Sequence, residues 1–112
     1  MNWEKILTSR YNNGDLMEAI ISGIDEIDTD RGSVQYLLLD HVKINDVPLD
    51  NKTYGLYVST PLGDYITRKY PDWHDMLGKV IRFEKMEHTN VWERGNMKRV
   101  SMFMPYDPIN WK

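Results

Sequence analysis

Residues 16–44 read "LMEAIISGIDEIDTDRGSVQYLLLDHVKI", and this stretch decides the fold because it predicts a long β-hairpin. The isoleucine-rich run 16–27 alternates in part between two faces, as a half-buried strand does. Gly23 inside that run indicates a bulge or a sharp bend. Residues 28–33 supply a glycine-containing turn, and the apolar run after it predicts a second strand over 33–44.

The rest of the chain adds shorter elements to this hairpin. A β-like run over 54–60 predicts a third strand, and the alternation in 79–87 and 98–106 predicts a fourth and a fifth. Between the third and fourth strands we expect one short helix within 62–70, because the proline that follows limits its length. Residues 2–10 carry apolar side chains on one helical face and predict a further short helix.

This order of elements is typical of a mainly β protein. Five strands in so short a chain favour a small closed barrel, since closure leaves no exposed sheet edge. The order, together with "MLGKVIRFE" at residues 76–84, resembles the OB-fold, which has a helix between its third and fourth strands. The resemblance covers residues 15–105. It implies a five-stranded OB-fold-like barrel with a short helix between strands 3 and 4.

Within that resemblance, the chain looks most like the small OB-fold proteins of bacteriophages and mobile elements, several of which bind single-stranded nucleic acid. The whole chain, 1–112, is then one OB-fold-like domain, flanked by the N-terminal helix and a C-terminal tail. An SH3-like barrel and an α+β roll remain open as alternative folds.

Composition limits the classes of function. The 112 residues include no cysteine, which excludes disulfides, zinc–thiolate sites and thiol nucleophiles. No apolar run approaches the roughly 18 residues that span a membrane. The N-terminus lacks the basic start and apolar centre of a secretory signal. We therefore predict a cytoplasmic protein that does not enter a membrane.

Charge is distributed unevenly along the sequence. The net charge is −3, but residues 79–99 hold six Lys and Arg against three Glu, a balance of +3 that leaves −6 for the remainder. This asymmetry predicts a basic final hairpin on an acidic body.

The basic segment contains the first candidate surface, "HTNVWERGNMKR" at residues 88–99. In the barrel it is the loop between the last two strands, where OB-folds contact oligonucleotides. Single strands need aromatic faces for stacking and cations that follow the phosphates. Trp92 offers the face, and Arg94, Lys98 and Arg99 offer the charge. The alternative is a polar hairpin whose tryptophan packs back on its own strand.

The second candidate surface lies on the middle of the predicted sheet. Tyr36, His41 and Lys43 come from the second strand. Tyr54 and Tyr57 come from the third, and these are the strands that carry the ligand in OB-folds. Arg31, in the first hairpin turn, is expected beside the same groove. The alternative is that these tyrosines only complete the core, with their hydroxyls in water.

Metal binding and catalysis have little support in the sequence. Asp28, Asp30 and Gly32 match the start of an EF-hand loop, but its twelfth position is Leu39 instead of glutamate. The three histidines are scattered, and "YPDWHD" at 70–75 is explained as a turn of polar caps. We therefore predict a non-enzyme with no cofactor and no metal.

The function expected from these features is binding of single-stranded nucleic acid without strong sequence preference, accessory to phage-like replication or recombination. The alternative is a protein-interaction module that inhibits or recruits a host protein, through its methionine-rich and aromatic surface or its acidic face. The tail, with Tyr106, Ile109 and Trp111, either docks on the barrel or anchors a partner. The oligomeric state stays open.

Overall fold

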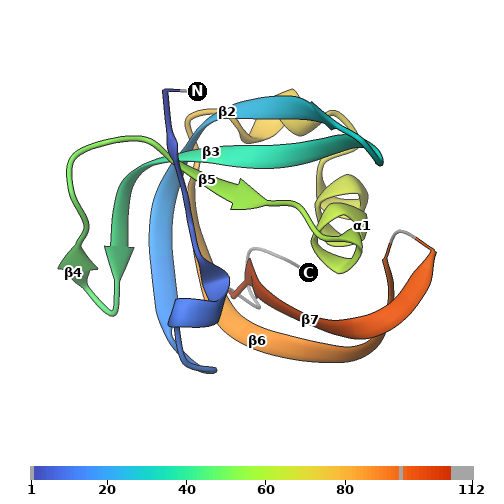
Figure 1. Ribbon diagram of the computed structural model, residues 1–112. Helices are drawn as coiled ribbons and strands as arrows, with labels where there is room; N and C mark the ends of the chain where they lie inside the picture. Colours follow the sequence, from blue (N-terminus) through green and yellow to red (C-terminus); the bar gives the residue numbers. More distant parts are fainter. Residues whose placement is uncertain (1, 94, 107–112) are drawn as a thin grey trace.

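The long hairpin predicted at residues 16–44 is the centre of the structure, a computed structural model that describes residues 2–93 and 95–106 (Figure 1). Strands β2 (Leu16–Thr29) and β3 (Gly32–Ile44) pair antiparallel through a tight turn, where Gly32 has a φ of +108°. The register shifts between Ile21 and Gly23, so the predicted irregularity at this glycine is confirmed.

The remaining elements also follow the predicted order. Strand β4 (Val47–Pro48) pairs antiparallel with the end of β3, and β5 (Tyr54–Tyr57) pairs antiparallel with the middle of β3. Helix α1 (Thr60–Lys69) confirms the helix predicted between the third and fourth strands. A short 3₁₀ helix, η2 (Trp73–Met76), leads into β6 (Val80–Glu93) and β7 (Asn96–Pro105).

The fold is mainly β, but the predicted closed barrel is wrong, because the strands form one open mixed sheet. Its order is β1-β5-β3-β2-β6-β7, with β4 added to β3. Among the described residues β7 pairs only with β6, and the outer edge of β5 is taken by β1 (Glu4–Lys5), which runs parallel to it. Closure would need that same edge of β5, so the N-terminal strand occupies the position where the barrel would close.

The helix predicted over residues 2–10 is also wrong. Glu4 and Ile6 donate their backbone N–H groups to the carbonyls of Thr53 and Gly55, at 3.0 and 2.8 Å, so this segment is extended. Only η1 (Thr8–Arg10) is helical, as a single 3₁₀ turn. Because an isolated helix this short has little stability in water, burial of Ile6, which is 4 % exposed, decides the conformation.

The core lies inside the curve of the sheet. Its most deeply buried large side chains come from the long strands, β5, α1 and η2: Met17, Ile21, Leu37, Leu39, Leu56, Leu62, Ile66, Met76, Phe83 and Phe103. No helix in the described part of the chain is long and apolar enough to cross a membrane. The C-terminal tail, residues 107–112, lies outside the described residues, so docking of Ile109 and Trp111 stays a prediction.

Candidate functional site

The β6–β7 hairpin presents its tryptophan to solvent. Trp92 is 61 % exposed, and the residue directly opposite it in the hairpin, Met97, is 56 % exposed. More than half of the Trp92 surface is therefore open to solvent. The register shifts between His88 and Val91, which inserts one extra residue into β6. Such a bulge increases the local twist of a hairpin.

The cations expected around Trp92 are described only in part. Arg99 lies on β7, and its Nε is 3.8 Å from Glu87 Oε2, with 70 % of its side chain exposed. An ion pair this long and this exposed contributes little to stability, so Arg99 remains available to another anion. Arg94 lies outside the described residues. Lys98 lies in β7 opposite Val91, and its side chain is outside what the structure describes.

One lysine of the basic segment is not on the surface. Lys85 in β6 is 2 % exposed, and its Nζ donates to Asn13 Oδ1 at 3.1 Å. The backbone around it is also paired, because Lys85 N donates to Asp15 O and Lys85 O accepts from Gly14 N. The sequence count of positive charge on this hairpin therefore overstates what is presented to a ligand.

The second candidate surface is partly covered. Tyr36 and Tyr57 are register partners on β3 and β5, and their ring centroids lie 5.8 Å apart. Tyr36, however, is only 8 % exposed, because the ring of Trp3 packs against it at 4.8 Å. Tyr57 keeps an intermediate exposure. The ring of Tyr36 is therefore closed to a ligand by the protein's own N-terminal segment.

Trp3 is held in this position by three strands. Its Nε1 donates to Asp25 Oδ2 of β2 at 2.8 Å, and its ring lies against Tyr36 of β3 and Gly55 of β5. Lys5, from the same segment, places its Nζ 5.9 Å from the centre of the Tyr36 ring. Sequence reasoning missed both residues because it assigned this segment to a separate helix. Gly55 inside a strand was the available signal, since such a glycine often marks a close approach.

Arg31 and Lys43, the two cations of the second candidate surface, do not lie together. Arg31 is exposed in the β2–β3 turn, and Lys43 is exposed near the opposite end of β3, beside β4. In Figure 1 the β2–β3 and β6–β7 turns project on the same side of the view, with α1 between them. Arg31 and Lys43 therefore lie at opposite ends of β3.

The described residues hold no group of three or more histidines and carboxylates placed to share a metal ion. The "YPDWHD" segment is the predicted set of polar caps. Asp72 Oδ1 accepts from the His74 backbone N–H at 3.0 Å and lies 3.1 Å from His74 Nδ1. The backbone hydrogen bond is the main cause of the lowered pKa of Asp72, with a smaller part from the His74 side chain.

No protein-family model and no curated protein matches this sequence.

Proposed function

We propose that the protein binds single-stranded nucleic acid without strong sequence preference, through the β6–β7 hairpin, as an OB-type β protein accessory to phage-like replication or recombination. The observation that carries the proposal is the exposed indole of Trp92, 61 % accessible, on the same hairpin as Arg99. An exposed aromatic face beside cations is the combination that sequence-tolerant single-strand binding requires.

The strand order supports the OB-type interpretation. Strands β5, β3, β2, β6 and β7 are neighbours in that order, with α1 between β5 and β6 in the chain. The OB-fold is itself a partly open barrel, whose loops between the first two and the last two strands contact the ligand. The corresponding turns here carry Arg31 and the Trp92 hairpin. The proposed contact surface is therefore Trp92, Arg94, Lys98, Arg99, Arg31 and Tyr57.

The test is fluorescence anisotropy of a labelled oligothymidine at low salt. Trp92→Ala should weaken binding at least about fivefold, because stacking one base contributes about 1–3 kcal/mol. Val47→Ala is the matched control, since Val47 is also a large exposed apolar residue and lies on β4, far along the sheet. Both variants should keep the melting temperature of the wild type.

A second measurement separates charge from stacking. Replacing Arg99 with alanine should reduce the slope of log K against log salt by about 0.7 for each phosphate that the arginine neutralises in the wild type. Arg68→Ala on α1 is its control, as another exposed arginine. If the wild-type protein binds no single strand at low salt, the proposal is wrong.

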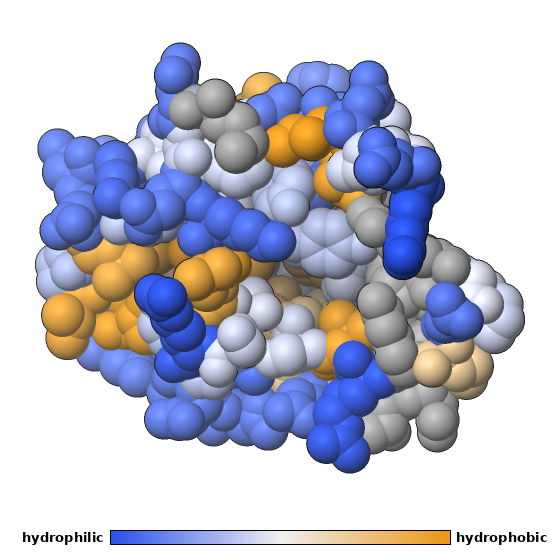
Figure 2. Space-filling view, viewed as in Figure 1, coloured by the Kyte–Doolittle hydropathy of each residue, from blue (hydrophilic) through white to orange (hydrophobic). Residues whose placement is uncertain are grey.

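The alternative, a module that inhibits or recruits a host protein, is favoured by one observation. Met97 lies directly opposite Trp92, and both are more than half exposed, so the hairpin end is apolar as well as aromatic. Figure 2 shows further apolar side chains gathered on the left of the same view, over β4, where Val47 is 63 % exposed. Partner binding of this kind would be abolished in a Trp92→Ala, Met97→Ala double variant and would depend only weakly on salt.

A further inference from the structure

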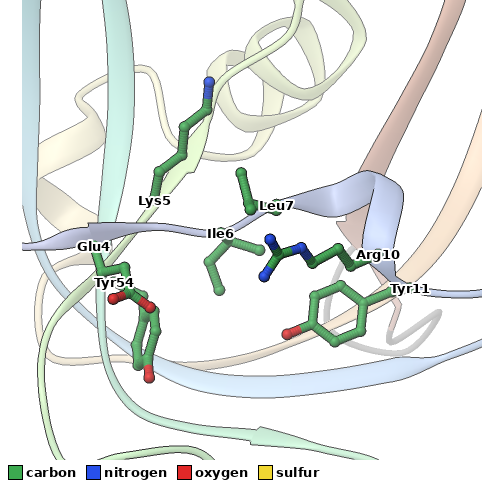
Figure 3. A pocket seen from close by; sticks show the side chains of 7 residues that line it. All are labelled: Glu4, Lys5, Ile6, Leu7, Arg10, Tyr11 and Tyr54. Atoms are coloured by element: carbon green, nitrogen blue, oxygen red, sulfur yellow. The ribbon is translucent and has the colours of Figure 1, made fainter.

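A cavity of about 430 Å³, open to solvent, lies beside the N-terminal strand, and no residue of the Trp92 hairpin lines it. It is lined by residues 4–7, by Arg10 and Tyr11 at the end of η1, and by Tyr54 at the start of β5. Figure 3 shows Arg10 and Tyr11 reaching from one side toward Tyr54 and Glu4 on the other, with Ile6 between them. The volume falls within the range of small-molecule sites.

Arg10 brings an uncompensated positive charge to this cavity. Within the described part of the chain its guanidinium has no ion pair and no hydrogen bond, and only its backbone N–H is used, bonding to Leu7 O at 3.0 Å. A guanidinium is always charged and offers five N–H donors in a planar fork that matches an oxyanion. The one carboxylate lining the cavity, Glu4, is already paired with Lys52 at 2.9 Å.

The two tyrosines add further donors. Tyr54 is 6 % exposed, and its hydroxyl has no hydrogen bond to another described residue. Among the described residues no fully buried polar side-chain atom lacks a partner, so this hydroxyl is at the part of Tyr54 that reaches solvent. A tyrosine hydroxyl is protonated and can donate at neutral pH, and burial, opposed in part by Lys52, raises the pKa of Tyr54 further above its ordinary value. Tyr11 is fixed by an edge-on contact with Phe103 at 5.6 Å, and its hydroxyl likewise has no partner in the described residues. Each hydroxyl therefore has an O–H donor to offer an acceptor that enters the cavity.

The walls between these donors are apolar. Ile6 contributes aliphatic surface, and the tyrosine rings contribute aromatic faces. Lys5, the other cation of the segment, points away from the cavity in Figure 3. A bare inorganic ion would leave this apolar surface uncovered, so the lining fits an anion attached to an apolar body.

We propose that this cavity binds a small organic oxyanion, a carboxylate or a phosphate monoester on an apolar body. Arg10 and the hydroxyls of Tyr11 and Tyr54 hold the anion, and Ile6 and the tyrosine rings pack against the body. This site is independent of the proposed nucleic-acid surface, since no residue is shared between them.

The test is an NMR titration of the ¹⁵N-labelled full chain with phenylacetate and with phenyl phosphate, using neutral phenylacetamide as the reference compound. We expect saturable shifts confined to the amides of residues 4–11 and 54, with a dissociation constant of about 1 mM or tighter for the preferred anion. The anion that binds with the higher affinity identifies the preferred headgroup as a carboxylate or a phosphate monoester.

Variants locate the binding. Arg10→Ala should weaken binding of the anion at least tenfold, and Tyr54→Phe and Tyr11→Phe should each weaken it severalfold. The control variant Arg68→Ala should leave the affinity unchanged. Arg10 is exposed, so its replacement should leave the amide spectrum otherwise unchanged. The proposal is overturned if neither anion shifts these amides at millimolar concentration, if phenylacetamide binds equally well, or if Arg10→Ala binds as the wild type does.

Discussion

At the scale of single residues, Gly55 shows how one missing side chain positions a whole segment. A Cβ atom at Gly55 would overlap Cε3 and Cζ3 of the Trp3 ring. The ring lies in that space and at the same time covers Tyr36 and donates to Asp25. The N-terminal segment can therefore lie along β5 only because residue 55 is a glycine.

Gly55→Ala should destabilise the protein by about 1–3 kcal/mol, the usual cost of forcing extra volume into a packed site. Gly63→Ala is the matched control, because its Cβ would meet Val58 Cγ1 at 3.4 Å, and alanine inside a helix is favoured by about 0.5–1 kcal/mol over glycine. Urea denaturation measures both. In a Trp3→Ala background, Gly55→Ala should cost much less, and an equal cost in both backgrounds would contradict the steric explanation.

At the scale of elements, the short 3₁₀ helix η2 begins at a side-chain cap. Asp72 accepts a hydrogen bond from the backbone N–H of His74. It accepts a second one from the His74 ring when Nδ1 of that ring is protonated. These bonds favour the ionised carboxylate and lower its pKa in the folded state. The stabilisation from this charge is then fully present above the carboxyl's pKa in the unfolded chain and is lost as the pH falls through the lower, folded value.

NMR titration of the Asp72 carboxyl should therefore give a pKa below the ordinary 3.8 in the folded protein and near it in urea. His74→Ala should raise the folded pKa only part of the way, because the larger contribution comes from the backbone N–H, which that variant keeps. A full return to the ordinary value in His74→Ala would show that the side chain, and not the backbone, holds the carboxylate.

At the scale of the whole molecule, β2 joins the two halves of the sheet. It pairs with β3 over most of its length and with β6 through residues 16–20, while β1, β4 and β7 lie at the margins. The buried side chains Met17, Ala19 and Ile21 follow one another along this strand. Opening of the sheet at β2 would therefore expose the core from both sides.

Hydrogen exchange should follow this arrangement. We expect the slowest amides in β2 and in the parts of β3 and β6 that pair with it, exchanging only by global unfolding, and faster exchange in β1 and β4. The comparison of exchange free energies with the free energy of unfolding in denaturant provides the measurement. Protection in β1 equal to that in β2 would instead make the N-terminal strand part of the central folding unit.

The sequence alone was enough to predict the features that depend on neighbouring residues. The β2–β3 hairpin follows from two β-like runs and the turn at Gly32, and α1 lies where the chain order placed a short helix. Local periodicity and turn chemistry act over a few residues, so a single sequence contains them.

The tertiary structure decided whatever depends on contacts between distant segments. The sheet is open, and the N-terminal strand pairs with the edge of β5, about fifty residues away in the chain. Trp3 of the same segment covers the ring of Tyr36. The buried Lys85 donates a hydrogen bond from its Nζ to Asn13 Oδ1. Arg10, Tyr11 and Tyr54 line one cavity only because that segment lies against β5. The free energy that selects these arrangements comes from burial between segments, and no local pattern in the sequence encodes which segments will meet.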